Sequence, residues 1–109
     1  MTEEIKVQKS SGNVFADLGL ENSDELLVKA ELAYKISSII TKLGITQVEA
    51  ARLLGIDQPK MSALINGKLS GFSTVRLFRF LNSLGRDVEI VVKDKPKSRS
   101  QARTQVVSR

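Results

Sequence analysis

Residues 58 to 68 carry side chains that suit contact with base edges. Four of these residues are short or uncharged and two are lysines: Gln58, Lys60, Ser62, Ala63, Asn66 and Lys68. The amide of Gln58 or Asn66 can form two hydrogen bonds with adenine N6 and N7, and Lys60 can reach guanine acceptors or a phosphate. A face that is only solvated would more often be dense in Glu and Lys. The segment therefore indicates contact with duplex DNA.

The turn after these residues has groups that suit phosphates. Gly67, Lys68 and Ser70 are expected to offer backbone N–H groups and one positive charge. Further charge would come, if they face outward, from Arg52, Arg76 and Arg79. A solvated surface role explains each of these arginines equally well.

Catalytic and metal chemistry find little support in the composition. The chain has no cysteine and no histidine, which excludes disulfides, zinc sites built on thiolate or imidazole, Cys nucleophiles and His-based acid–base catalysis. Its acidic residues fall mostly at helix starts or on solvated faces, so a catalytic carboxylate pair is a poor interpretation. We expect no enzyme, no metal and no cofactor. The absence of a long apolar run and of a signal sequence predicts a cytoplasmic protein without a membrane partner.

Charge is distributed unevenly along the chain. Residues 1–51 hold five Lys/Arg and eight Asp/Glu, whereas residues 52–109 hold twelve and four. With a sequence pI near 9.8, this favours a polyanionic partner for the C-terminal half. Basic surfaces also occur in proteins that bind no nucleic acid, so charge alone does not identify the partner.

The elements that would position the polar face form a predicted helix-turn-helix. Thr46 and Glu49 can make a capping box that starts a short helix. Ala51 is small where two helices would approach closely, and Gly55 can reverse the chain at positive φ. The alternative interpretation is an ordinary short helical hairpin that contains a glycine.

A second short helix is predicted to follow. Asp57 or Gln58 can cap it, Pro59 fits its first turn, and Asn66-Gly67 breaks it. The apolar positions expected to hold the two helices to the rest of the fold are Val48, Ala50, Leu54, Ile56, Met61, Leu64 and Ile65.

The remaining segments suggest a helical domain with flanking extensions. An N-terminal arm, 1–22, precedes a helix-turn-helix domain, 23–85. That domain includes a long first helix, in which apolar residues recur from Leu26 to Leu43, and a last helix after Ser73 with Val75, Leu77, Phe78, Leu81 and Leu84 on its apolar positions. Residues 86–94 contain a predicted β-strand, and residues 95–109 are predicted to be a disordered basic tail.

The motif also resembles a known family. Thr46-Gln47-x-Glu49-Ala50-Ala51-x-x-Leu54-Gly55-Ile56 and Ile65-Asn66-Gly67 are similar to the lambda-repressor-like (Cro/CI, XRE) helix-turn-helix family. The resemblance implies a mainly α bundle of about five helices. It places the helix Gln58 to Ile65 in the major groove and Thr46 and Gln47 against the DNA backbone.

The flanks of the motif resemble a narrower group. Val14-Phe15-Ala-Asp-Leu18-Gly-Leu20 and the stretch from Phe80 to Ile90 are similar to HigA-type antitoxins, encoded beside a RelE/HigB-like toxin, and this likeness covers about residues 14–93. It implies an autorepressor with a toxin partner. The alternative function is a protein-interaction module that chiefly neutralises such a toxin.

Sequence-specific repression implies two copies of the chain. Paired half-sites about 34 Å apart give the specificity that one recognition helix cannot. The predicted dimerisation residues lie in the strand: Val88, Ile90, Val91 and Val92. Pairing of this strand with its twin would form a homodimer on an inverted repeat, and the alternative is pairing with Ile5–Val7 within one chain.

Overall fold

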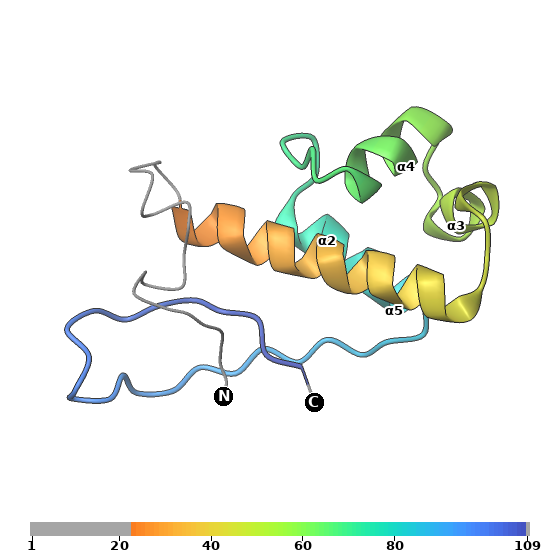
Figure 1. Ribbon diagram of the computed structural model, residues 1–109. Coiled ribbons are helices and arrows are strands. Elements are labelled where there is room, and N and C mark those ends of the chain that lie inside the picture. The colour runs from red at the N-terminus through yellow and green to blue at the C-terminus, as the bar shows by residue number, and fades with distance from the viewer. Residues whose placement is uncertain (1–22, 109) are drawn as a thin grey trace.

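The chain folds into a mainly helical bundle (Figure 1). The computed structural model describes residues 23–108, and the predicted arm over residues 1–22 lies outside them. Four helices span Ser23–Leu43 (α2), Gln47–Leu54 (α3), Gln58–Ile65 (α4) and Thr74–Ser83 (α5). The described part therefore has four helices, where the resemblance implied about five in the whole domain.

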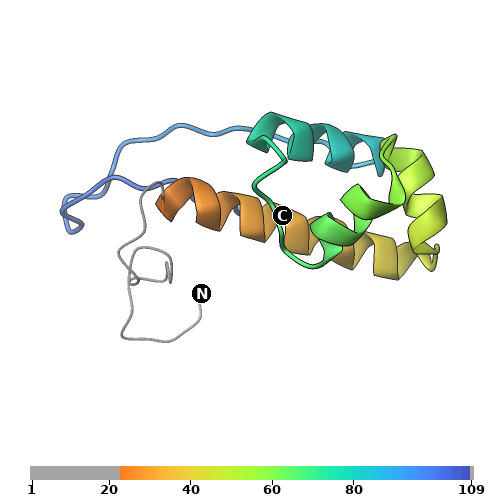
Figure 2. The same ribbon diagram turned by 90° about the horizontal axis from the view of Figure 1, so that it is seen from above.

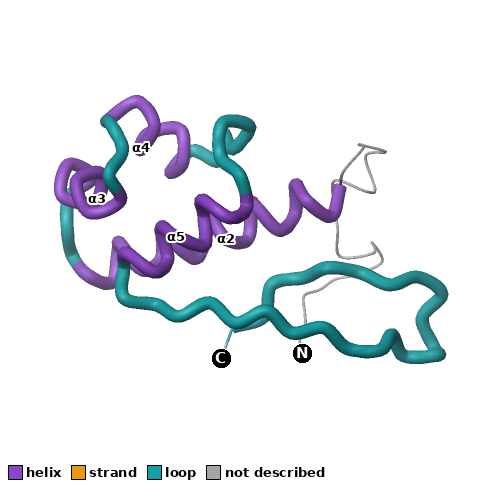
Figure 3. The backbone as a smooth tube through the Cα atoms, turned by 180° about the vertical axis from the view of Figure 1, so that it is seen from behind, coloured by secondary structure: helices purple, strands orange, loops and turns teal. Residues whose placement is uncertain are grey.

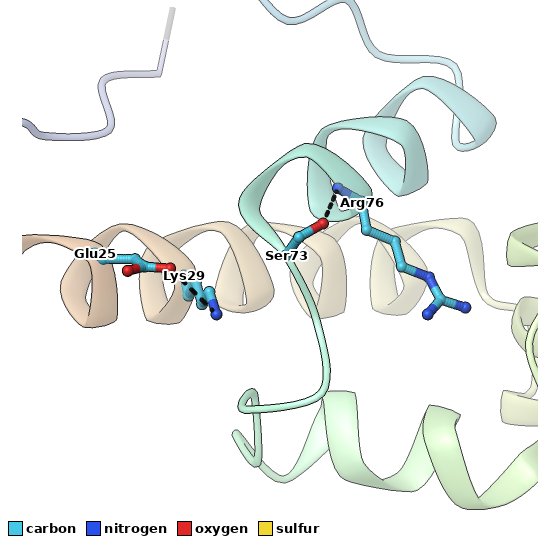
Figure 4. Close-up of polar contacts among 4 residues, drawn as sticks. All are labelled: Glu25, Lys29, Ser73 and Arg76. Atoms are coloured by element: carbon cyan, nitrogen blue, oxygen red, sulfur yellow. Dashed lines mark hydrogen bonds and ion pairs between the residues drawn. The ribbon is translucent and has the colours of Figure 1, made fainter. Parts of the chain in front are cut away.

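The first helix, α2, is the longest and provides the base of the bundle. Asp24 and Glu25 lie in its first turn, where the positive end of the helix dipole favours them. Glu25 also pairs with Lys29 one turn later at 3.5 Å (Figure 4). Gly44 follows the helix at a φ of 68°, the left-handed conformation that often ends a helix.

The start of α3 is fixed by the predicted capping box. The Thr46 side chain accepts a hydrogen bond from the backbone N–H of Glu49 at 3.1 Å, and the Glu49 carboxylate accepts one from the backbone N–H of Thr46 at 2.8 Å. These two bonds satisfy N–H groups that a helix start leaves without partners. Gly55 then ends α3 in the left-handed conformation, with φ 71° and ψ 32°.

Helix α4 begins and ends through equally local signals. The Asp57 side chain accepts from the backbone N–H of Lys60 at 2.9 Å, and Pro59 lies in the first turn. At the other end the backbone N–H of Lys68 donates to the Ala63 carbonyl at 2.8 Å and that of Gly67 to the Leu64 carbonyl at 3.2 Å. Both ends of the helix are thereby closed by residues between Asp57 and Lys68.

Helices α2 and α5 run along each other and form the main pair (Figure 2). Helix α3 packs on α4 and α5, and α4 packs also on α2. The largest fully buried side chains come from α2, α4 and α5: Ile36, Met61, Leu64 and Leu77. Ala51, only 5% exposed, lies in the buried face of α3, which fits the prediction of a small residue at a close helix approach.

Leu43, the last residue of the predicted apolar pattern in α2, is 49% exposed, and two further positions predicted to be apolar anchors also lie outside the core. Val48 is 52% exposed and Val75 is 56% exposed. Val48 lies off the buried face of α3 that Ala50, Ala51 and Leu54 form. Val75 lies on the side of α5 opposite Leu77, Phe80 and Leu81. In both cases the helical turn of about 100° per residue carries the side chain away from the core.

The predicted strand over Val88–Val92 is not formed in the described part of the chain, where residues 86–96 belong to neither helix nor strand. Val88 packs partly against the core, whereas Ile90, Val91 and Val92 are 72%, 63% and 92% exposed. A strand needs a neighbouring strand for its ladder, and no described segment of this chain is one.

The C-terminal segment, residues 86–108, lies on the side of the α2–α5 pair opposite α4 (Figures 1 and 3). It turns back at residues 97–101, and Val106 packs partly on the core. Burial raises the pKa of Glu31 on α2, although a hydrogen bond with the Val106 backbone opposes that rise. The Glu31 Oε1 atom is buried and has no hydrogen-bond partner among the described residues.

Replacement of Gly55 tests the chain reversal between α3 and α4. We expect Gly55→Ala to lower the free energy of unfolding by about 1 to 2 kcal/mol, because a left-handed φ brings Cβ close to the following carbonyl oxygen. No neighbouring atom lies within 4 Å of a Cβ added there, so the cost would come from the backbone alone. Gly71→Ala is the matched control, since Gly71 has equal space and no positive φ. Equal losses in denaturant unfolding of the two variants would contradict this account.

The capping box predicts an acid-dependent loss of stability. The pKa of Glu49 is lowered, first by the hydrogen bond from the Thr46 backbone and then by that from the Thr46 side chain. A carboxyl whose pKa is lowered in the folded state stabilises that state above the unfolded-state pKa and loses this effect as the pH falls. The melting temperature of the parent should exceed that of Glu49→Gln at neutral pH, and the difference should shrink as the pH falls below about 4.3. A difference that does not change with pH would exclude the charge of Glu49 as its source.

Candidate nucleic-acid interface

Helix α4 presents most of the predicted base-reading residues on its exposed side. Gln58, Lys60 and Ser62 are exposed, and so is Asn66 just after the helix, whereas Ala63 is half-buried. Met61 and Leu64, predicted as the structural positions of the motif, have almost no exposed surface. The apolar anchors thus fix the helix and leave the polar side chains in solvent.

Two of these polar side chains form a hydrogen bond with each other. The Asn66 amide nitrogen donates to the Ser62 hydroxyl at 3.3 Å, one turn apart. An amide nitrogen has two hydrogens, so Asn66 keeps one donor and its carbonyl oxygen for a further partner. The bond limits the rotation of both side chains before any ligand arrives.

The start of α3 supplies one free side chain and one engaged side chain. Gln47 and Thr46 are both exposed, but the Thr46 hydroxyl takes part in the capping box with Glu49. Gln47 is the first residue of α3. The predicted contact of Thr46 and Gln47 with the DNA backbone stays a prediction, and the geometry favours Gln47 as the one with an available side chain.

The turn after α4 differs from its expected role. The backbone N–H groups of Gly67 and Lys68 close α4 through its own carbonyls, so these two groups are not available to phosphates. Lys68 keeps an exposed side chain for such a contact, and Ser70 is also exposed. For the Gly67 and Lys68 N–H groups the expectation failed, because helix closure uses the donors that an open turn would offer. The expected contact of the Ser70 backbone N–H stays a prediction.

A cluster of cations and aromatic rings joins α4 to α5. Lys60 Nζ lies 5.6 Å from the centre of the Phe72 ring, and Arg76 Cζ lies 5.7 Å from it. Arg76 Cζ also lies 5.6 Å from the centre of the Phe80 ring. Both cations are at distances where a ring attracts positive charge.

Phe72 and Phe80 were missed as members of the candidate interface. Phe72 lies in a loop with polar neighbours and yet is only 2% exposed. An aromatic residue in such a loop is the signal that could have pointed to it. The Arg76 side chain leaves the first turn of α5, whose cap is the Ser73 hydroxyl at 3.1 Å from the Arg76 backbone nitrogen (Figure 4).

An open hollow of about 450 Å³ lies beside this cluster, lined by Leu54, Ser73, Val75, Arg76, Arg79, Phe80 and Ser83. Its charged lining residues are the two arginines. Arg79 is exposed and Arg76 is partly exposed, so both meet the outward-facing condition under which the sequence assigns them to phosphates.

None of the described helices combines the length and the apolar character that a membrane crossing needs.

Comparison with known proteins adds two matches. A helix-turn-helix domain family matches residues 14–93. A solved structure named as an XRE family transcriptional regulator is 48% identical in sequence, with a TM-score of 0.77, and the match covers 80% of this chain and 98% of that one. No curated protein matches the chain.

These matches confirm the family expected from the motif residues, while the toxin-linked subgroup stays a prediction. The family match spans most of the chain, including all four described helices up to residue 93. By sequence and by fold, the chain belongs to the XRE helix-turn-helix family.

Proposed function

We propose that this protein is a transcriptional regulator that binds duplex DNA sequence-specifically through α4. The observation that carries the proposal is the division of α4 into two sides. Met61 and Leu64 are buried in the core, whereas Gln58, Lys60 and Ser62 are exposed on a helix that contains no acidic residue. An α-helix fits the major groove, where each base pair presents a distinct pattern of donors and acceptors.

Within this proposal the exposed side chains have separate roles. Gln58 and Asn66 read bases, since an amide can pair with adenine N6 and N7 at once. Ser62 orients Asn66 through their hydrogen bond. Lys68 and the arginines of α5 contact phosphates, which positions the protein without reading sequence.

The regulator acts as a homodimer on an inverted repeat and represses by occupying its site. Ile90, Val91 and Val92 are exposed apolar residues in one short segment. A segment of β-branched residues suits a strand, and pairing with the same segment of a second copy would supply the missing ladder and bury these side chains. One dimer would then present two α4 helices to the DNA.

Selection of bound DNA from a random duplex pool tests the main proposal. We expect recovered sequences to share an inverted repeat. Recovery of a single unrepeated half-site would contradict the dimer, and a lack of any enriched sequence would contradict specific DNA binding.

A second candidate function is the neutralisation of a RelE/HigB-like toxin. The observation that favours it is the position of the C-terminal segment on the side away from α4, where a protein partner would not block the DNA-binding face. Copurification with the product of a neighbouring gene, lost when residues 95–109 are deleted, would support it. Copurification that survives the deletion would assign the partner to another surface.

Alanine variants separate base reading from phosphate contact. Gln58→Ala should weaken binding to the selected site by about 1 to 3 kcal/mol and leave binding to random duplex nearly unchanged. Lys68→Ala should weaken both and reduce the slope of log affinity against log salt by about one. Titrations at several salt concentrations measure both effects. Equal losses on both DNAs for Gln58→Ala would show that the reading face lies elsewhere.

A proline in the exposed apolar segment tests the dimer. Val91→Pro removes a backbone donor that a strand ladder would use, so sedimentation should show monomers at concentrations where the parent is dimeric. Helical content should persist, because the four helices end at Ser83. Thr104→Pro, in the exposed stretch without helix or strand that follows the turn at residues 97–101, is the matched control and should remain dimeric. A dimeric Val91→Pro protein would exclude this segment as the subunit junction.

A further inference from the structure

One aromatic ring is shared by cations from two different helices. Lys60 belongs to α4 and Arg76 to α5, and their charged groups lie 5.6 Å and 5.7 Å from the centre of the Phe72 ring. The residues are separated by sixteen positions in the chain, so only the fold brings them together. The Phe72 ring therefore lies beside a charged group from the recognition helix α4 and another from the following helix α5.

The ring is held rigidly beneath the two cations. Phe72 is 2% exposed and meets Phe80 edge to face, with ring centres 5.9 Å apart and planes at 74°. Its backbone N–H also donates to the Leu69 carbonyl at 3.0 Å. A buried ring with fixed neighbours offers a constant position to the side chains that lie over it.

No carboxylate in the described part of the chain pairs with either cation. Among the described residues the structure records no ion pair for Lys60 or Arg76. Two positive groups that face one ring repel each other, and an anion between them would relieve that repulsion. Attraction to the ring is what holds them near each other in the absence of such an anion.

We propose that Phe72 is a positioning residue that holds Lys60 and Arg76 together as a two-cation clamp for the DNA backbone. The proposal rests on the proposed function and refines it, since it assigns Lys60 to a phosphate and not to a guanine. A lysine that lies over a ring beside α5 is drawn away from the reading side chains of α4. Fixed cations lose less side-chain entropy on binding than free ones, so the ring raises affinity without adding sequence preference.

The contact between ring and cation can be tested without DNA. In NMR spectra of the free protein, the Lys60 Cε protons should show upfield ring-current shifts that disappear in Phe72→Leu. Leucine keeps an apolar side chain in the core and removes the ring. Lys60 protons at their ordinary shifts in the parent would overturn the proposal.

A double-mutant cycle tests the consequence for binding. Phe72→Leu should weaken binding to the selected site and to random duplex by the same factor, about two- to fivefold for each cation it releases. In the Lys60→Ala, Arg76→Ala background the same substitution should have no further effect. Leu81→Val, another change in the core at a residue that has no aromatic ring, controls for a general loss of stability.

Three results of the binding measurements would also overturn the clamp. Phe72→Leu could weaken binding equally in the parent and in the Lys60→Ala, Arg76→Ala variant, which would mean that Phe72 supports only the structure of the core. Lys60→Ala could change the preferred base at one position of the site, which would make Lys60 a base reader. A parent that binds no duplex would reject the proposed function and the clamp with it, whereas the NMR shifts would still report whether the ring positions Lys60.

Discussion

The burial of Met61 and Leu64 is the interaction on which the candidate interface depends. Helix α4 has eight residues, and isolated helices shorter than about 12 to 15 residues are marginal in water. Its helical state must therefore come from packing, and these two side chains are almost fully buried. Because they occupy the inner side of α4, the outer side is free to carry polar groups that contribute nothing to the core. The same two contacts thus stabilise the helix and determine which residues face outward.

Local chemistry explains why much of this fold could be predicted from the sequence. The capping box at Thr46, the left-handed turn at Gly55 and the caps at Asp57 and Ser73 each depend on residues within a few positions of one another. Such signals are complete in a short stretch of chain. The exposure of the polar residues on α4 could also be predicted, because Met61 and Leu64 must face the core and the opposite side of the helix then faces solvent.

The features that the sequence did not predict depend on contacts between distant residues. Apolar character alone could not tell that Val48 and Val75 lie off the buried faces, because that depends on where the neighbouring helices lie. The donors of Gly67 and Lys68 are consumed by closure of α4, a detail of helix-end geometry. The strand at Val88–Val92 requires a partner that the described part of one chain does not contain. Phe72 meets Lys60 and Arg76 only in the folded protein.

The C-terminal segment lies across the α2–α5 pair from α4, and this placement has a thermodynamic consequence. Ligands on opposite sides of the bundle do not exclude each other by steric overlap, so both could occupy one molecule. Any influence of one on the affinity of the other would have to pass through the packed helices between them. Linkage makes such a coupling free energy reciprocal: a partner that tightens DNA binding would itself be bound more tightly by the DNA complex, and one that weakens it would be released by DNA.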